Sequence, residues 1–170
     1  KVYELIEQAG NQGFSVYVDC YPYNAFATRI GSAVFDEKSM AEGKFSYDQI
    51  MFATGPFAGK YCNEQLYMEA RTKYPESFAI GFGMSEDEIC YAYTRNETMI
   101  SSDGFVLGHQ GHPRTAGSFP RVLGKYVRDD RVLKLEEALY KMTLKPAMAV
   151  GLKKKGLIEP GNDADLVIFD

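Results

Sequence analysis

The residues that could perform chemistry lie close together in residues 99–114, MISSDGFVLGHQGHPR. Asp103 follows a run that favours a strand, and His109, His112 and Arg114 come soon after it. A carboxylate at the end of a strand can accept a proton from a metal-bound water molecule, or it can ligate the metal itself. These residues alone leave two interpretations open: an Asp-Gly turn, in which the aspartate bonds its own backbone, or the edge of an active site.

The histidines and the arginine of this stretch also have alternative roles. A metal site usually needs three or four ligands, and His109 and His112 are the only histidines of the chain. We therefore interpret both as loop-stabilising or substrate-facing residues rather than as metal ligands. The guanidinium of Arg114 suits bidentate recognition of a carboxylate, although an ordinary surface ion pair is the alternative.

Two predicted strands must position these groups. Residues 14–19 and 98–101 are rich in β-branched and aromatic residues, and a helix over residues 2–9 precedes the first strand. A helix, a glycine turn and a strand in this order indicate an α/β protein. Tyr21 and Tyr23 follow the first strand, where they either contact a ligand or pack as half-buried rings.

The segment between the two strands is too long for one connection of a compact unit. We interpret it as an elaborated insertion of short helices and irregular loops. Within it, Ser85 and Glu88 form a capping-box pattern that predicts a helix over residues 85–94.

The remaining elements are expected after Asp103. We predict a loop over 104–118, a helix over 119–126 with Pro120 in its first turn, and an amphipathic helix over 135–142. A short helix over 146–150 and a final strand over 166–169 complete the chain. The final strand has no following partner, so we expect a segment of a longer protein in which this strand begins a different sheet.

Composition excludes several classes of protein. The chain has 170 residues, 45% of them hydrophobic, and a net charge of −4, so no basic surface favours nucleic acid or an anionic membrane. No run reaches the roughly 18 apolar residues of a membrane span. The cysteines, Cys20, Cys62 and Cys90, are odd in number and form no CxxC pair, which indicates a reducing cytoplasm.

Short blocks along almost the whole chain resemble the N-acyl-D-amino-acid deacylases (D-aminoacylases) of the amidohydrolase superfamily. The HPR and GSFPRVLG blocks are the ones that point to the deacylases, whereas the last two blocks alone indicate only the superfamily. In chain order the blocks are DCYPY (19–23), MSEDE (84–88), ISSDG (100–104), HPR (112–114), GSFPRVLG (117–124), KMT (141–143), PA (146–147), GLIEPG (156–161) and ADLVIFD (164–170).

This resemblance implies a specific architecture. Residues 1–156 would be the C-terminal part of a TIM (β/α)8 barrel, with strand seven ending at Asp19, strand eight ending at Asp103 and an insertion over about 24–97. Residues 157–170 would begin a small β-sandwich.

The resemblance also implies zinc-dependent hydrolysis of the amide bond of N-acyl-D-amino acids. Asp103 matches the aspartate that acts as general base and then general acid beside the zinc site, and it is a candidate zinc ligand. Tyr21 and Arg114 match substrate-binding residues, with Arg114 holding the substrate carboxylate. The other zinc ligands would lie upstream of Lys1, so the implied partners are a small-molecule N-acyl amino acid and the rest of the same polypeptide, and the segment is not expected to be active alone.

Two departures and two alternatives accompany this interpretation. Residues 24–28 read NAFAT where the family has a Gly-Ser-type turn, and residues 105–111 are glycine-rich where relatives carry acids. A dihydroorotase- or hydantoinase-like cyclic amidase would share Asp103 but would not need Arg114. A catalytically silent barrel remnant would act as a binding module, and it would lack the upstream His-x-His and further histidines of an active enzyme.

Overall fold

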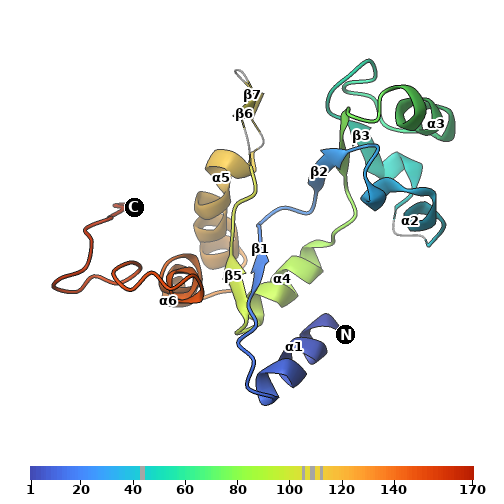
Figure 1. Ribbon diagram of the computed structural model, residues 1–170. Coiled ribbons are helices and arrows are strands. Elements are labelled where there is room, and N and C mark those ends of the chain that lie inside the picture. Colours follow the sequence, from blue (N-terminus) through green and yellow to red (C-terminus); the bar gives the residue numbers. More distant parts are fainter. Residues whose placement is uncertain (43–44, 105, 108–109, 112) are drawn as a thin grey trace. The chain divides into compact units, whose positions relative to one another are not determined.

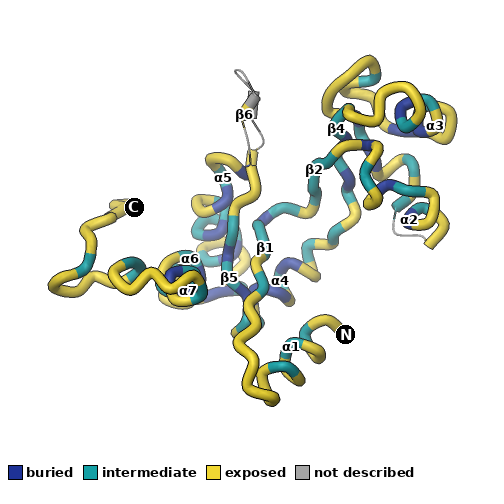
Figure 2. The backbone as a smooth tube through the Cα atoms, viewed as in Figure 1, coloured by how far each residue is buried: buried dark blue, intermediate teal, exposed yellow. Residues whose placement is uncertain are grey.

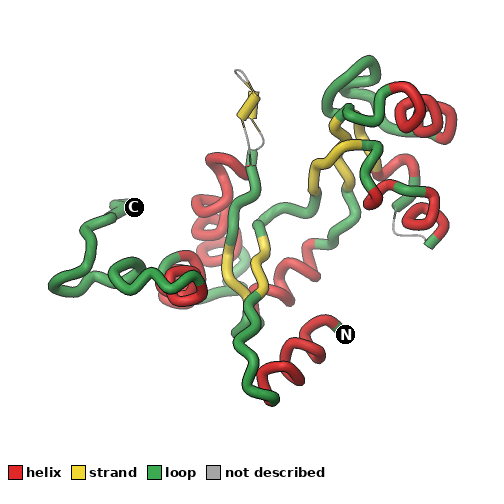
Figure 3. The backbone as a smooth tube through the Cα atoms, in the orientation of Figure 1, coloured by secondary structure: helices red, strands yellow, loops and turns green. Residues whose placement is uncertain are grey.

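The computed structural model describes residues 1–42, 45–104, 106–107, 110–111 and 113–170. These residues form two units: unit 1 comprises Lys1–Pro22 and Asp87–Asp170, and unit 2 comprises Tyr23–Glu86. Figure 1 shows the elements of each unit, and Figure 3 shows their helices, strands and loops. Among the helices of the described residues, none combines the length and apolar composition that crossing a membrane requires.

Unit 1 contains two parallel strands from distant parts of the sequence. Strand β1 (Val18–Cys20) pairs with β5 (Thr98–Ile100), with Val18 opposite Thr98 and Cys20 opposite Ile100. Parallel pairing joined through helices confirms the α/β class predicted from the sequence. β1 is shorter than the predicted strand over 14–19, because residues 14–17 are exposed and lie outside the paired register.

Helices of unit 1 surround this pair and supply its core. The predicted helices are confirmed as α1 (Val2–Asn11), α4 (Glu86–Thr94), α6 (Leu135–Met142) and α7 (Leu144–Ala149). The rings of Tyr93 and Tyr126 meet edge to face, with centroids 5.0 Å apart, in a core that includes Ile89, Ile100, Val122, Leu133 and Ala138. Buried Lys141 donates hydrogen bonds to the backbone carbonyls of Arg95 and Thr98, which fixes α6 at the start of β5.

The segment after β5 differs from its prediction. A short hairpin, β6 (Val106–Leu107) with β7 (Gln110–Gly111), is followed by α5 (Arg114–Arg121) and a π-helix, η3 (Val122–Asp129). The predicted loop over 104–118 is therefore wrong from residue 114 onward, and Pro120 lies near the end of α5 rather than in a first turn. Tertiary contacts of the buried residues Arg114 and Ser118 offset the low helix propensity of the glycine and proline of α5. The wide π turns begin just after Pro120, which has no N–H to donate.

The C-terminal segment also differs from its prediction. Residues 163–170, all of them described, form neither helix nor strand, and the four apolar side chains of residues 166–169 are 51–98% exposed (Figure 2). A strand requires a neighbour for its backbone groups, and no described segment pairs with this one. The predicted strand over 166–169 is therefore not observed in this chain.

Unit 2 contains a sheet that the sequence analysis missed. Strands β2 (Phe26–Arg29), β3 (Ile50–Phe52) and β4 (Phe78–Gly81) form an antiparallel sheet in the order β2-β4-β3. Its other elements are η1 (Ala33–Phe35), α2 (Glu37–Ala41), η2 (Tyr47–Gln49) and α3 (Glu64–Lys73). Arg71 of α3 donates to the carbonyls of Ile30 and Phe35, at 2.6 and 2.7 Å, and so joins the helix to the end of β2. The insertion is thus a small α+β unit rather than short helices and loops.

Candidate functional site

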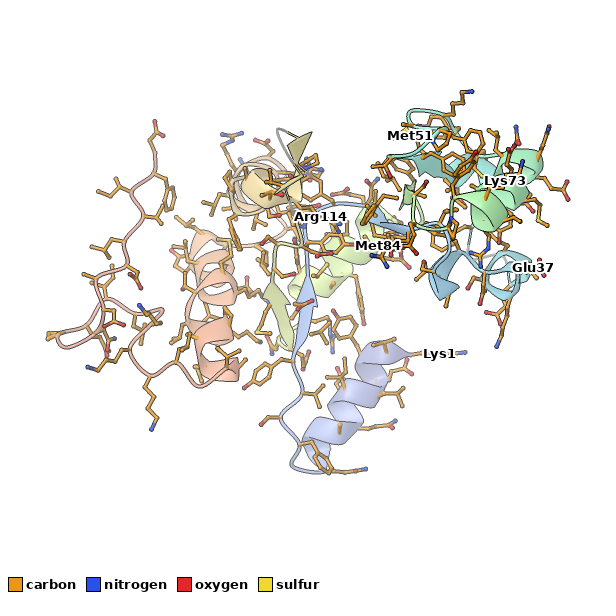
Figure 4. The ribbon with its side chains drawn as sticks, turned by 45° about the horizontal axis from the view of Figure 1, so that its top comes forward. Lys1, Glu37, Met51, Lys73, Met84 and Arg114 are labelled. Atoms are coloured by element: carbon orange, nitrogen blue, oxygen red, sulfur yellow. The ribbon has the colours of Figure 1, made fainter. Side chains whose placement is uncertain are left out.

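The C-terminal ends of β1 and β5 bring three predicted site residues together. Tyr21 follows β1 directly, Asp103 lies three residues beyond β5, and Arg114 is the first residue of α5, where Figure 4 labels it. Because β1 and β5 are parallel, their carboxyl ends share one edge, which is where α/β proteins commonly place ligands. Tyr21 and Asp103, which are 82 positions apart in the sequence (103 − 21), therefore meet in one site.

The guanidinium of Arg114 stacks on the ring of Tyr21. Its Cζ atom lies 4.2 Å from the ring centroid, and the Arg114 side chain is only 2% exposed. A cation over a desolvated aromatic face is held more firmly than one at the surface. Burial raises the pKa of Tyr21, against the opposing effect of the Arg114 charge, so the phenol stays neutral and can donate a hydrogen bond at pH 7.

Arg114 also pairs with Asp103. The distance from Arg114 Nη1 to Asp103 Oδ2 is 3.4 Å, and the side chain of Asp103 is 72% exposed. The cation is thus fixed by its surroundings, while the carboxylate reaches it from solvent. Exposed carboxylates hold such pairs weakly, so an external carboxylate could exchange for Asp103 at the same guanidinium. The site can therefore bind an anion and place a proton acceptor beside it.

Gly104 permits the close approach of Asp103 to Arg114. Its φ angle lies outside the left-handed region, so the backbone conformation at this position does not require glycine. A Cβ atom added to Gly104 would instead lie 2.5 Å from the Thr115 backbone nitrogen and 2.6 Å from its Cα atom. The absence of a side chain lets the end of the β5 segment pack directly against the first turn of α5.

We expect Gly104→Ala to lower the free energy of unfolding by about 1–3 kcal/mol, because the added methyl group must displace backbone atoms. Denaturant unfolding followed by circular dichroism measures this change. Gly10→Ala is the matched control, because a Cβ atom there meets nothing within 4 Å and the position is helical. Equal unfolding free energies for the two variants would contradict the packing role of Gly104.

The sequence analysis missed one residue at this site, Arg121. Its Nε atom donates a hydrogen bond to the carbonyl of Pro22, at 2.7 Å, and Pro22 is fully buried next to Tyr21. Arg114 and Arg121 are seven residues apart, the spacing that places two side chains on one helix face. This signal was present in the sequence, but the prediction of a loop over 104–118 concealed it.

The described residues do not form a metal centre by themselves. Nowhere in the described ranges do three histidine, cysteine, aspartate or glutamate side chains gather in a way that could hold a metal ion. His109 and His112 lie outside the described residues, so the interpretation of both as loop residues stays a prediction. Asp103 offers one oxygen donor suited to zinc, and the other ligands would have to come from elsewhere.

Comparison with known proteins gives concordant matches in sequence and in fold. Residues 91–170 match the profile of the amidohydrolase family. The chain is 35% identical over 164 residues to the D-aminoacylase of Alcaligenes xylosoxydans xylosoxydans, a match that covers 91% of this chain and 32% of that protein. A crystal structure of N-acyl-D-glutamate deacylase from Bordetella bronchiseptica, complexed with zinc and a phosphonate inhibitor, has 34% identity and a TM-score of 0.78. That match covers 96% of this chain and 35% of the other, so the chain spans about a third of the length of these relatives.

Cyclic amidases match a smaller part of the chain. A dihydroorotase of Lactobacillus acidophilus is 45% identical over 78 residues, which cover 46% of this chain and 18% of that protein. The similarity to the deacylases therefore extends over about twice as much of the chain as the similarity to this dihydroorotase.

Proposed function

We propose that this chain is part of a zinc-dependent N-acyl-D-amino-acid deacylase of the amidohydrolase superfamily, and that it carries the general base and the carboxylate-binding residues of the active site. The observation that carries the proposal is the ion pair between exposed Asp103 and buried Arg114, whose guanidinium also stacks on the ring of Tyr21. The similarity to D-aminoacylase and N-acyl-D-glutamate deacylase over more than nine-tenths of the chain supports the same activity.

In the proposed reaction, Arg114 binds the carboxylate of the N-acyl amino acid through its planar guanidinium. Tyr21 orients the guanidinium and can donate a hydrogen bond from its neutral hydroxyl. Once the substrate carboxylate replaces Asp103 at Arg114, a carboxylate oxygen of Asp103 accepts a proton from the attacking water and later delivers it to the leaving amine. Zinc, when bound, would supply Lewis-acid activation of the amide carbonyl and of that water.

The proposed architecture is the C-terminal part of a (β/α)8 barrel. In it, β1 and β5 would be strands seven and eight, residues 1–156 would belong to the barrel and residues 157–170 would begin the β-sandwich. The parallel pairing of β1 with β5 and the position of Tyr21 and Asp103 beyond their carboxyl ends support this assignment.

The free state of the three cysteines supports a cytoplasmic location.

An activity panel on the full-length protein that contains this chain tests the proposal. We expect release of free amino acid from N-acetyl-D-amino acids, little release from the L-enantiomers, and loss of activity with a chelator that added zinc restores. Turnover of dihydroorotate or a hydantoin in place of the acyl amino acids would favour a cyclic amidase. The absence of any hydrolysis by zinc-loaded, folded protein would favour a silent binding module.

A further inference from the structure

One helix contacts two consecutive residues at the end of β1. Arg114, at the start of α5, stacks on the ring of Tyr21, and Arg121, at the end of α5, hydrogen-bonds the carbonyl of Pro22. The two arginines are two helical turns apart and therefore lie on the same face of α5. Both ends of α5 thus contact the segment that carries Tyr21.

Arg121 contacts the chain just beyond the end of β1, where pairing with β5 no longer holds the backbone. The paired register of β1 and β5 ends at Cys20 and Ile100. Among the described residues, the backbone hydrogen bond from the Ser101 nitrogen to the Cys20 carbonyl lies just beyond it. Pro22 lies beyond this point and, as a proline, has no N–H to donate. A charged donor at 2.7 Å from its carbonyl therefore supplies a fixed point for the backbone that follows Tyr21.

Between the two arginines, a buried side chain bonds the backbone of Arg114. Ser118, which is 1% exposed, donates from its Oγ atom to the Arg114 carbonyl at 2.9 Å. This bond closes the first turn of α5 from within, at the residue that carries the guanidinium.

We propose that Arg121 is a positioning residue for carboxylate recognition. By holding the Pro22 carbonyl, it keeps the ring of Tyr21 under the guanidinium of Arg114 and so sets the orientation in which that guanidinium meets a substrate carboxylate. Arg121 itself does not contact substrate in this arrangement. The proposal rests on the proposed function of Arg114 and extends it to a residue whose side chain acts through the backbone of Pro22.

Steady-state kinetics of Arg121→Met and Arg121→Lys in the zinc-loaded full-length protein test this role. We expect Arg121→Met to raise KM for an N-acyl-D-amino acid about tenfold, the effect of losing one charge-assisted hydrogen bond. KM for the corresponding N-acyl amine, which lacks the carboxylate, should stay unchanged, and Arg121→Lys should recover part of the loss because its ammonium can still donate. Arg128→Met is the matched control, since Arg128 is 77% exposed and pairs with its neighbour Asp129, and it should change KM less than about twofold.

A double-mutant cycle separates positioning from a general structural role. If Arg121 acts through Tyr21, then Arg121→Met should add almost nothing to the KM of a Tyr21→Leu variant. Additive effects, equal effects on the two substrates, or a KM like that of the Arg128 control would overturn the proposal. If Arg121→Met does not fold, Arg121→Lys alone carries the test. A KM that rises for the N-acyl amino acid and stays unchanged for the N-acyl amine supports the proposal, whereas equal KM values on both substrates, raised or not, overturn it. Failure of the wild-type protein to hydrolyse any N-acyl amino acid is a separate result, which would reject the proposed function itself.

Discussion

Replacement of Asp103 by asparagine is expected to lower kcat for N-acyl-D-amino acids about 10³-fold, as loss of a general base commonly does. The substitution preserves the shape of the side chain and leaves an amide oxygen that can still accept a hydrogen bond from Arg114. It removes the group that takes up the proton of the attacking water. Because the Asp103 side chain is 72% exposed, we expect the melting temperature to change by less than about 2 °C.

Three measurements check this result together: kcat, bound zinc and the melting temperature of the full-length protein. Asp87→Asn serves as the control, because Asp87 is an exposed carboxylate in the first turn of α4. A variant of Asp103 that keeps its folding and zinc but loses turnover fits the role of a proton acceptor. Retained turnover in Asp103→Asn would remove that role.

The second large effect is expected for Arg114→Ala. Losing a bidentate, charge-assisted contact with the substrate carboxylate should raise KM for N-acyl-D-amino acids about 100-fold. The KM of Arg114→Lys should lie between those of the wild type and Arg114→Ala, because lysine keeps the charge but loses the planar fork. Truncating a side chain that is 2% exposed also leaves a cavity, so a lower melting temperature is expected as well.

Comparison of two substrates isolates the recognition effect from the loss of packing. KM should rise for the N-acyl amino acid and change little for an N-acyl amine without a carboxylate, since a cavity affects both substrates alike. Arg128→Ala provides the control for removal of an exposed arginine from the neighbouring helix η3. A similar rise of KM for both substrates would contradict recognition of the carboxylate by Arg114.

Patterns within single segments predicted much of unit 1. The capping box at Ser85 and Glu88, and the i, i+3, i+4, i+7 spacing that begins at Leu135, identified α4 and α6 because both signals depend on neighbours in the sequence. The grouping of Asp103 with Tyr21 came from the resemblance, which implies that the two residues follow consecutive barrel strands. Local chemistry alone left both a turn and a site open at Asp103, and only the surrounding sequence blocks indicated a site.

The features that sequence analysis missed depend on distant partners. Strands of three or four residues such as β3 and β4 carry too few positions to show alternation, and each becomes a strand only by pairing across unit 2. Helix α5 was missed because glycine and proline lower its intrinsic propensity, whereas the contacts of Arg114 with Tyr21 and of Ser118 with the Arg114 carbonyl offset that loss. The requirement for Gly104 was also invisible, because it arises from the backbone of Thr115 and not from the turn itself.

The separation of β1 from β5 in sequence has a consequence for the order of folding. Residues 21–97 must form a loop before these strands can meet, and the antiparallel pairing of Phe26 with Gly81 brings the ends of that loop near each other. This pairing would shorten the effective loop roughly fourfold and reduce the entropic cost of closing it by about 1.2 kcal/mol. We therefore expect unit 2 to fold before β1 and β5 associate. Substitutions that weaken the β2–β4 pair should then slow the assembly of the site, although Tyr21, Asp103 and Arg114 all lie outside unit 2.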